Sequence, residues 1–465
     1  MRKVLQKALP LIIVAVMLCS LLIFFGVALN RDDGLGVTET NLALGANIQG
    51  GAGCKSAFDD NKMTSWTFAA AGSQAIVDFG EEKEINALLL NEIGHNVKQF
   101  SIYTMHDGEW ELKYRQNEIG VNRLATFYTV KTNKVKITFD QFKNVVSIAD
   151  VKIFNLDKRE RQEKLRVTSY ITPGSLRNGQ IDPACFDVVT DVQLIAYGRF
   201  DGQGNIEDGI GSDGFGKRAD AELSILKDMI GGRDVNIYLT IFPPLSPDNM
   251  ADMLRNHMDD AVNNVVERVL ATGTDGADFD WEYPANAEEY RLYSDFLVKL
   301  KTQLANHNKK LSVALSPWGV QLSKQAVEAI DLLQIMAYDL FDHNGDNNSY
   351  AGSVDSAVRY MMGRGFRAEQ IFLGISYYGR PSDGRGEWYN YNDPKFDPDE
   401  FVMYQNHVWF NTPTTVRDKT VYAILKGLGG IMTFAQDEDV AMSAPLSLTA
   451  QIGKAREAFS EVVYE

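Results

Sequence analysis

Hydrophobic and polar positions follow two different patterns along this chain, and the change comes near residue 165. Between residues 40 and 156, short apolar runs show the two-residue alternation of β-strands and little helical periodicity. Their spacing predicts an all-β module, either an antiparallel sandwich or a jelly roll. The strongest strand candidates are Ala75–Phe79, Ala87–Leu90, Phe100–Tyr103, Ala125–Val130, Val135–Phe139 and Asp150–Phe154.

From residue 165 onward, short β-like runs alternate with longer segments of helical periodicity. Eight such runs with helical crossovers predict parallel strands in a (β/α)8 barrel, the TIM-barrel architecture. A doubly wound open sheet is the alternative, but no glycine-rich dinucleotide fingerprint supports it. The strand candidates are Arg166–Ile171, Val192–Tyr197, Val235–Ile241, Gly276–Trp281, Leu311–Leu315, Leu332–Ala337, Ile371–Ile375 and Gly430–Phe434. The helical segments are Ala219–Ile230, Pro247–Leu270, Ala287–Asn306, Gln325–Ile330, Ser353–Gly363 and Thr415–Lys426.

The N-terminal residues form a third pattern. Three basic residues precede an almost uncharged apolar run from Ala8 to Leu29, so the rest of the chain is expected on the outer side of a membrane. The run is long enough to span a bilayer, for which about 20 residues suffice. Gly26–Ala28 also offers small residues to a signal peptidase. Residues 1–30 are therefore an uncleaved membrane anchor or a signal peptide, and we expect an extracellular or cell-surface protein.

These patterns divide the chain into four parts, so we expect a multidomain protein. Residues 1–30 are the targeting segment, residues 38–156 the β module and residues 165–463 the barrel. Residues 157–164 between the module and the barrel are entirely polar and mostly charged. Such a composition predicts an exposed linker or a short helix.

Charge and cysteine content narrow the classes of function. A net charge of −16 argues against nucleic acid or an anionic membrane surface as a partner, whereas a neutral polysaccharide or glycan is compatible with it. Cys54 and Cys185 lie in different predicted domains and Cys19 lies in the targeting segment, so no disulfide framework is expected. The six histidines show no spacing typical of metal ligands. We expect a monomer.

Residues 275–284, Asp-Gly-Ala-Asp-Phe-Asp-Trp-Glu-Tyr-Pro, carry the strongest functional signal in the chain. Asp278, Asp280 and Glu282 alternate with apolar residues, so in a strand the three carboxyl groups share one face, about 6–7 Å apart. Helical patterns flank the segment, which places the strand in a parallel sheet with both faces buried. Three acids on a buried face are costly unless they share protons and do chemistry. Glu282 also follows the fourth barrel strand, where catalytic groups of such barrels lie.

This segment resembles the Asp-x-x-Asp-x-Asp-x-Glu signature of glycoside hydrolase family 18, the chitinases and endo-β-N-acetylglucosaminidases, with Asp275 as its first acid. Three further segments resemble the family in the right order. Met336–Asp339 matches a Met-x-Tyr-Asp motif at the end of the sixth strand, and Leu373–Arg380 and Gly427–Met432 look like the seventh- and eighth-strand segments. The resemblance covers residues 165–461. It implies a chitinase-like hydrolase of β-1,4 linkages at N-acetylglucosamine that needs no cofactor for catalysis.

The resemblance also implies a role for each acid. Glu282 would protonate the glycosidic oxygen as general acid and later activate water as base. The substrate's own 2-acetamido oxygen would attack the anomeric carbon, because this family relies on substrate assistance. Asp280 would orient the acetamido N–H and balance the charge of the oxazolinium ion, and Asp278 would share a proton with Asp280. Tyr338 would hold the acetamido carbonyl at attack distance, unless it is only a core tyrosine at a strand end.

Further candidates would contact the acids or the substrate. Tyr170 and Thr240 are expected to hydrogen-bond to Asp278. Asp339 either contacts substrate or closes a turn, and Arg380 either binds sugar hydroxyls or pairs with the acidic surface. The other substrate-binding candidates from the strand ends are Met336, Tyr378 and Phe434. Three aromatic residues in predicted loops stay outside the candidate set because exposed rings are common: Trp318, Trp388 and Tyr389.

Three departures from the family pattern bear on the substrate. The Ser-x-Gly-Gly motif that usually follows the third strand is replaced by Thr240–Pro243, which keeps a hydroxyl but loses both glycines. Phe434 stands where the family usually has a Trp as the floor of the central sugar subsite, and a phenyl ring stacks with less area. Between Ile375 and Gly430 there is no room for the small α+β insertion of many processive chitinases. We therefore expect a shallow, open cleft.

Three functions stay open on these grounds. The first is hydrolysis of chitin or chitooligosaccharides. The second keeps the chemistry but acts as an endo-β-N-acetylglucosaminidase on the di-N-acetylchitobiose core of glycans or on a cell-wall polymer, which Phe434 and the short insertion favour. The third is a catalytically inactive chitinase-like lectin. Such relatives typically lack the acid at the position of Glu282, which this chain retains.

The β module resembles a discoidin-type (coagulation factor 5/8 type C) module, similar to many carbohydrate-binding modules. The segments that carry this resemblance are Asn41–Ala43, Ala57–Asn61, Thr64–Trp66, Val77–Gly80 and Ile148–Phe154. It implies a structural calcium ion near the loop of Asp59 and Thr64, completed by Asp150 of the closing strand, since oxygen ligands suit calcium. The alternative is that Asp59, Asp60 and Asn61 simply form a turn.

Overall fold

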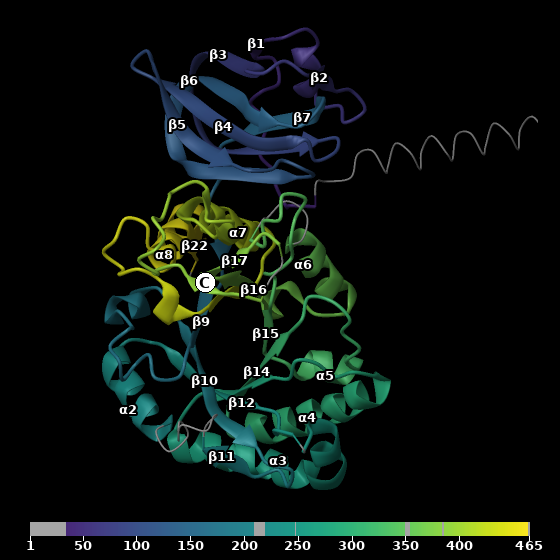
Figure 1. Cartoon of the computed structure of the whole chain (residues 1–465), viewed down its shortest axis with the longest axis vertical. Coiled ribbons are helices and arrows are strands. Elements are labelled where there is room, and N and C mark those ends of the chain that lie inside the picture. Colours follow the sequence, from purple (N-terminus) through teal and green to yellow (C-terminus); the bar gives the residue numbers. More distant parts are fainter. Residues whose placement is uncertain (1–33, 209–218, 247, 349–353, 384–385, 464–465) are drawn as a thin grey trace, which may run out of the picture.

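The computed structural model describes residues 34–208, 219–246, 248–348, 354–383 and 386–463. An all-β module and a closed barrel follow one another along the longest axis (Figure 1). The predicted targeting segment, residues 1–30, lies outside the described residues. Among the helices that are described, none is both long and apolar enough to cross a membrane.

The N-terminal module is built from antiparallel strands. They are β1 (Asn47–Gly50), β2 (Trp66–Phe68), β3 (Gln74–Glu92), β4 (Val97–His106), β5 (Glu109–Gln116), β6 (Arg123–Phe142) and β7 (Val146–Phe154). The order is β2-β7-β3-β6-β4-β5, and β1 pairs with β3. The first half of β3 pairs with β1 and the second half with β7, so the strand runs through both layers of the module. Side chains of both halves enclose one core around Trp66, Phe100 and Phe139.

The long strands β3 and β6 each contain two of the strands that the sequence predicts separately. Their shared ladder shifts register between Asp78 and Lys83 and again between Ile85 and Ala87. Such bulges bend a strand without ending it. The polar residues at these points therefore mark bends, and the prediction of four separate strands was wrong. The all-β architecture itself is confirmed.

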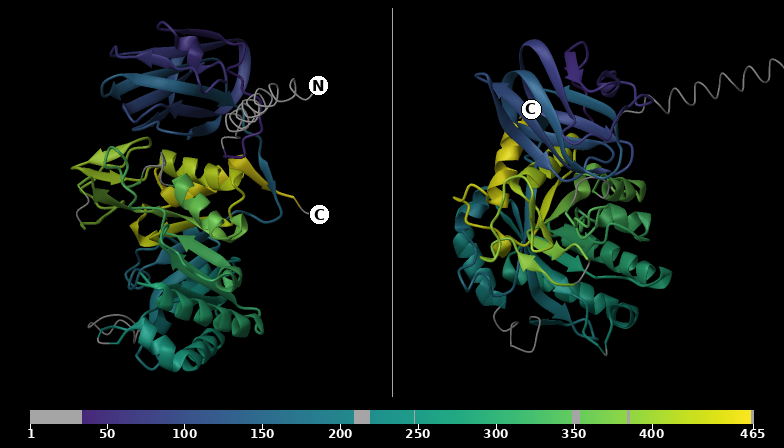
Figure 2. Two further views of the ribbon diagram at one scale, coloured as in Figure 1. Left: turned by 90° about the vertical axis from the view of Figure 1, so that its right-hand side faces the viewer. Right: turned by 45° about the horizontal axis from the view of Figure 1, so that its top comes forward.

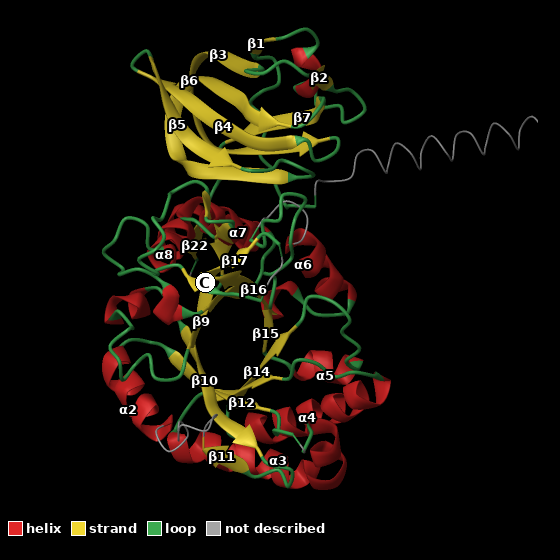
Figure 3. Cartoon of the chain, in the orientation of Figure 1, coloured by secondary structure: helices red, strands yellow, loops and turns green. Residues whose placement is uncertain are grey.

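The second domain is a barrel of eight parallel strands surrounded by helices (Figure 3). The strands are β9 (Arg166–Ile171), β10 (Asp191–Phe200), β12 (Asn236–Phe242), β13 (Gly276–Asp280), β14 (Lys310–Leu315), β15 (Leu332–Ile335), β16 (Ile371–Ser376) and β21 (Gly430–Phe434). They pair in chain order, and β9 pairs with both β10 and β21, which closes the sheet. A short strand, β11 (Ile206–Asp208), pairs antiparallel with the last residues of β10. The predicted (β/α)8 barrel is confirmed, and the open-sheet alternative is excluded.

The described helices of the barrel lie close to the predicted ones, except for α8, for which no helix was predicted. They are α2 (Ala219–Ile230), α3 (Met250–Thr272), α4 (Ala287–Ala305), α5 (Lys324–Ala329), α6 (Val354–Gly363), α7 (Pro413–Leu425) and α8 (Leu448–Phe459). Capping residues set several of their starts: the Asn286 side chain accepts the N–H of Glu288 and Glu289 at the start of α4, and Thr412 caps α7 ahead of Pro413.

The module rests on the α7 side of the barrel (Figure 2). Asp418 of α7 is fully buried there, and its carboxylate accepts hydrogen bonds from the Tyr114 hydroxyl at 2.7 Å and the Thr126 N–H at 2.9 Å. Arg417 donates to the Thr126 carbonyl at 2.9 Å. Separation of the domains would leave these buried groups without partners, which is costly. The two domains are therefore joined by a specific polar interface.

Two connections differ from the sequence predictions. Residues 157–164 were predicted to be an exposed linker or a short helix, but they include β8 (Arg159–Arg161), which pairs with β22 (Ser460–Val462) near the end of the chain. Between β16 and α7, where no insertion was expected, the chain forms a small antiparallel sheet. Its strands are β17 (Tyr378–Pro381), β18 (Tyr389–Asn390), β19 (Met403–Gln405) and β20 (Val408–Phe410). Both elements escaped notice because strands of two to four residues leave almost no periodic signal.

Candidate active site

A cleft of about 420 Å³ opens at the carboxyl ends of the barrel strands, where barrel enzymes place their active sites. Nearly every barrel strand contributes a residue from its last positions or from the loop that follows. The cleft is lined by Tyr170, Ile195, Phe242, Asp280, Glu282, Tyr283, Ala314, Ser316, Pro317, Trp318, Met336, Tyr338, Asp339, Leu340, Tyr378, Trp388, Met432 and Phe434.

Asp278 lies beneath this cleft and is fully buried. Its Oδ2 accepts hydrogen bonds from the Thr240 hydroxyl at 2.9 Å and from the Tyr170 hydroxyl at 3.1 Å. Burial raises the pKa of Asp278 to about 6, while hydrogen bonds from Ser312, Thr240 and Tyr170 oppose that rise. Asp278 is thus poised to hold or release a proton near neutral pH.

Asp280 ends β13, Glu282 follows two residues later, and both line the cleft itself. Burial first, and then the charges of Glu282 and Asp278, raise the pKa of Asp280 well above its ordinary value. Asp280 is hydrogen-bonded to Glu282, and a bond between two carboxyl groups requires a proton between them. Glu282 is exposed to the cleft, whereas Asp278 and Asp280 lie deeper. The three acids therefore form a row from the barrel interior to the cleft surface.

Tyr338 follows β15 and faces this row across the cleft. Burial raises the pKa of Tyr338 well above its ordinary value, and the nearby charges of Asp280, Glu282 and Asp339 raise it further. The phenol is therefore neutral, and its hydroxyl remains a hydrogen-bond donor. A donor at this place can hold a carbonyl oxygen of a bound sugar beside the acids.

Asp339 sits in a polar cluster on the wall of the cleft. Its backbone has a φ of +56°, a left-handed conformation that Asp adopts more readily than most residues. Its Oδ2 accepts from the Tyr378 hydroxyl at 2.9 Å and from Arg380 at 2.6 Å, and its Oδ1 accepts from Asn347 at 3.2 Å. Asp339 therefore lines the cleft in a bend of the chain, and its contact with substrate stays a prediction. Arg380 reaches the cleft through its pair with Asp339.

An aromatic wall stands next to these polar groups. The Trp388 ring stacks on Tyr378 with centroids 4.4 Å apart and an interplanar angle of 11°, and it meets Phe434 edge-on at 6.3 Å. Trp388 is 51% exposed, so a large apolar face remains open to the cleft. Trp388 lies in the loop immediately before β18 of the small sheet that the sequence did not predict. It adds aromatic area beside the position where Phe434 replaces the usual tryptophan.

The structure brings most of the predicted site residues together. Asp280, Glu282, Tyr338 and the substrate-binding candidates Tyr170, Met336, Asp339, Tyr378 and Phe434 line the cleft, and Asp278 and Arg380 contact residues that do. Asp275, the first acid of the motif, accepts the N–H of Ile237 at 2.9 Å and ties β12 to β13 instead. Trp318 and Trp388 were left out of the prediction although both line the cleft. No spacing in the sequence marks them, because they come from loops.

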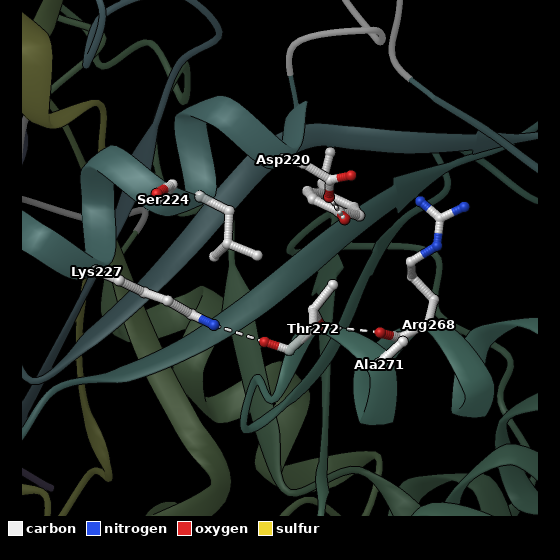
Figure 4. A pocket seen from close by; sticks show the side chains of 8 residues that line it. Asp220, Ser224, Lys227, Arg268, Ala271 and Thr272 are labelled. Carbon is white, nitrogen blue, oxygen red and sulfur yellow. Dashed lines mark hydrogen bonds between the residues drawn. The ribbon is translucent and has the colours of Figure 1, made fainter.

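A second pocket, of about 450 Å³, lies on the outer side of the barrel between α2 and α3 (Figure 4). Lys227 donates to the Thr272 carbonyl at 2.6 Å, and the Tyr197 hydroxyl donates to Asp220 at 2.5 Å. The guanidinium of Arg268 lies 5.7 Å from the centre of the Tyr197 ring. These polar groups bind one another, and this pocket has no row of acidic side chains. The cleft at the strand ends is therefore the candidate active site.

The loop of the N-terminal module predicted to hold calcium has a distinctive arrangement of oxygen atoms. The Thr64 Oγ1 lies 2.9 Å from both carboxylate oxygens of Asp59, 2.8 Å from the Asn61 carbonyl oxygen and 3.1 Å from the Ser56 carbonyl oxygen. A hydroxyl has one proton and cannot satisfy four acceptors. Such a convergence of oxygen atoms fits a calcium ion.

Asp150, the third predicted calcium ligand, is buried on β7. Its Oδ2 lies 3.7 Å from the Lys152 ammonium, which also pairs with Asp60 at 2.7 Å. Lys152 thus links Asp150 to the loop. Its charge would have to be accommodated beside a bound cation.

Comparison with known proteins matches each domain to a family model. The model of the glycosyl hydrolases family 18 matches residues 246–439, which include the row of acids and Tyr338. The F5/8 type C domain model matches residues 40–151 of the N-terminal module. Both resemblances found in the sequence are thereby confirmed, whereas the domain limits and the roles of the site residues stay predictions.

Several curated proteins to which the chain is similar are chitinases. Sporulation-specific chitinase 2 of Saccharomyces cerevisiae is 24% identical over 235 residues, which cover 45% of this chain and 42% of that protein. The chain spans about half the length, or less, of the curated relatives it matches: 42%, 52% and 35% for the first three.

Solved structures show the same barrel. A family 18 chitinase from the chitin utilization locus of Flavobacterium johnsoniae has a TM-score of 0.52 at 20% identity and covers 64% of this chain and 96% of its own. A catalytic domain of a Group II chitinase from Ostrinia furnacalis, in complex with penta-N-acetylchitooctaose, has a TM-score of 0.52 at 16% identity over 63% of this chain and 96% of its own. At these identities the likeness shows the fold of the barrel.

Proposed function

We propose that this protein is a retaining glycoside hydrolase that cleaves β-1,4 linkages at N-acetylglucosamine by substrate-assisted catalysis. The observation that carries the proposal is the row of Asp278, Asp280 and Glu282, which faces Tyr338 across the cleft. The family 18 match and the chitinase relatives support a hydrolase of this class.

In the first step, Glu282 gives a proton to the glycosidic oxygen, and the bond from that oxygen to the anomeric carbon breaks. The acetamido oxygen of the same sugar forms a new bond to that carbon, which leaves a positively charged oxazolinium ring. Tyr338 donates to the acetamido oxygen beforehand and holds it in place. The Asp280 side chain turns away from Glu282 and pairs with Asp278. In this position its carboxylate accepts a hydrogen bond from the acetamido N–H and balances the new positive charge.

In the second step, Glu282 takes a proton from a water molecule, whose oxygen attacks the anomeric carbon from the side of the departed group. The oxazolinium ring opens, the acetamido group is restored and Glu282 is protonated again. Two displacements at one carbon retain its configuration. Asp278 can accommodate the shifting proton because its pKa lies near 6.

Chitin or chitooligosaccharides are the substrates we propose first. Curated relatives of the chain include chitinases, and one similar solved structure contains a chitooligosaccharide. The aromatic wall of Trp388 and Phe434 suits the apolar faces of sugar rings. A second candidate is endo-β-N-acetylglucosaminidase action on a glycan core or a cell-wall polymer. Phe434 in place of the usual tryptophan favours it, since this leaves a differently shaped subsite.

One experiment separates these functions. The protein is incubated in parallel with chitotetraose and with a high-mannose glycopeptide, and the products are separated and weighed by mass spectrometry. Products from chitotetraose alone support a chitinase, and products from the glycopeptide alone support the second candidate. Binding without products from either would identify a lectin and refute the hydrolase. The Glu282→Gln variant should bind both ligands and release no products, and turnover by this variant would remove Glu282 from its role.

We also propose a structural calcium ion in the N-terminal module, held by Asp59 and Thr64 with Asp150 nearby. The convergence of four acceptors on the Thr64 hydroxyl supports it. Such an ion would fix the loop, supply no chemistry to the cleft and raise the stability of the module.

For the location of the protein, we propose the extracellular side or the cell surface. The charge distribution of residues 1–33 supports export, with basic residues ahead of an apolar run and acidic residues behind it. A polymeric substrate outside the cell agrees with that location.

A further inference from the structure

A cluster of metal-ligating side chains lies between the two domains, away from both sites described above. His95 comes from the loop between β3 and β4 of the module, and Glu118 follows β5. His343 comes from the barrel, in the loop that follows β15. The two imidazole rings stack with centroids 3.7 Å apart and an interplanar angle of 12°. One ligand atom from each of the three residues lies within 4.8 Å of the others.

Glu118 is the centre of this cluster. Its Oε1 lies 2.6 Å from the His95 Nδ1 and 3.6 Å from the His343 Nδ1. The side chain is fully buried, and Asp342 of the barrel loop lies against it. The Oε2 of Glu118 and the Oδ2 of Asp342 are both buried, and neither receives a hydrogen bond from a donor in the described part of the chain. Two buried carboxyl groups that face each other in this way need a shared proton or a cation.

We propose that His95, Glu118 and His343 bind a divalent transition-metal ion, of which Zn²⁺ is the best fit, between the module and the barrel. Two imidazole nitrogens and a carboxylate oxygen are ligands typical of zinc, whereas Ca²⁺ and Mg²⁺ favour oxygen ligands alone. Asp342 is the neighbouring group available to complete the ligand set or to orient a ligand. Since its ligands come from both domains, the ion would cross-link them.

The cross-link would reach the active-site cleft through a chain of hydrogen bonds. In the loop that carries His343, Asn344 donates to the Asn117 carbonyl of the module at 3.0 Å. Asn117 in turn donates to Asp346 at 3.1 Å. The same loop continues to Asn347, which donates to Asp339 on the cleft wall at 3.2 Å. An ion at the cluster would therefore hold the loop that begins at Tyr338 and Asp339.

The test uses the full chain, which is stripped with a chelator and dialysed. It is then titrated with ZnCl₂ by isothermal calorimetry, with excess calcium present throughout. We expect one zinc ion per chain and a higher melting temperature. His343→Asn should weaken binding by at least the roughly 100-fold that loss of an outer-shell partner can cost, and it should abolish the thermal shift. Its side chain is 62% exposed, so the variant should fold, which circular dichroism checks.

The matched control is His307→Asn, an exposed histidine in another part of the barrel, which should leave zinc affinity unchanged. Glu118→Gln keeps the shape of the side chain and should abolish zinc binding. Absence of a stoichiometric zinc site in the wild type would overturn the proposal. So would a dissociation constant that His343→Asn and Glu118→Gln leave at the wild-type value.

Discussion

Burial of the charged Asp278 carboxylate should lower the stability of the folded protein, and Asp278→Asn tests this directly. The carboxylate lies in the barrel interior with only hydroxyl donors around it. An asparagine has nearly the same shape, and its amide oxygen can still accept from Thr240 and Tyr170. The substitution therefore removes the charge and keeps most contacts.

The magnitude follows from the pKa shift. The pKa of Asp278 is raised from 3.8 to about 6 in the folded protein, so the folded state holds this proton more tightly than the unfolded state does. The wild type then loses stability as the pH rises from about 4 to 6 and stays penalised above that range. The penalty is about 3 kcal/mol at pH 8 and about 0.5 kcal/mol at pH 4. At about 2 °C per kcal/mol for a domain of this size, Asp278→Asn should melt about 6 °C higher than the wild type at pH 8 and about 1 °C higher at pH 4.

Thermal melts followed by circular dichroism at pH 4 and pH 8 measure this difference. Asp228→Asn, at an exposed position on α2, is the matched control and should change the melting temperature little at either pH. Asp278→Asn should also lose most of its hydrolytic activity, because Asp280 loses the partner to which it turns. An equal shift at both pH values, or a lower melting temperature at pH 8, would refute the reasoning.

Three further predictions concern the cleft and the calcium loop. Tyr338→Phe should lower kcat on chitotetraose about 100-fold or more and change KM little, because its hydroxyl acts on the reacting acetamido group; an unchanged kcat would argue against that contact. Trp388→Ala should raise KM about three- to tenfold with kcat nearly constant, since it removes a stacking surface. Steady-state kinetics measures both constants, and a lower kcat with an unchanged KM would contradict this role. Removal of calcium by a chelator should lower the melting temperature, and added Ca²⁺ should restore it. Asp59→Asn should abolish this response and Asp107→Asn, in an exposed turn of the same module, should preserve it; a response that survives Asp59→Asn would place calcium elsewhere.

The parts of this protein that the sequence predicts well are those with a long periodic signal. Most barrel strands and helices show it, because apolar residues recur along them at the spacing of a buried face. The row from Asp278 to Glu282 could be read because alternation along one strand fixes which side chains share a face. Tyr338 was found through a motif at the end of its strand, and its orientation toward Asp280 needed the closed barrel.

What the sequence did not predict depends on contacts between distant segments. Trp388 reaches the cleft only because short strands fold it back over Tyr378. The cluster of His95, Glu118 and His343 has no ligand spacing along the chain, since its members meet only when the module packs on the barrel. The burial of Asp418 on α7 likewise follows from the packing of the module on the barrel, where the Tyr114 hydroxyl donates to it.

The central claim, that the substrate's own acetamido group acts as nucleophile beside Asp280, is tested most directly by the configuration of the first product. Proton NMR during hydrolysis of chitotetraose resolves the anomeric signals of the new reducing end before mutarotation mixes them. The account predicts that the β anomer forms first, because two successive displacements occur at the anomeric carbon. Initial formation of the α anomer would show a single displacement by water and would contradict the mechanism.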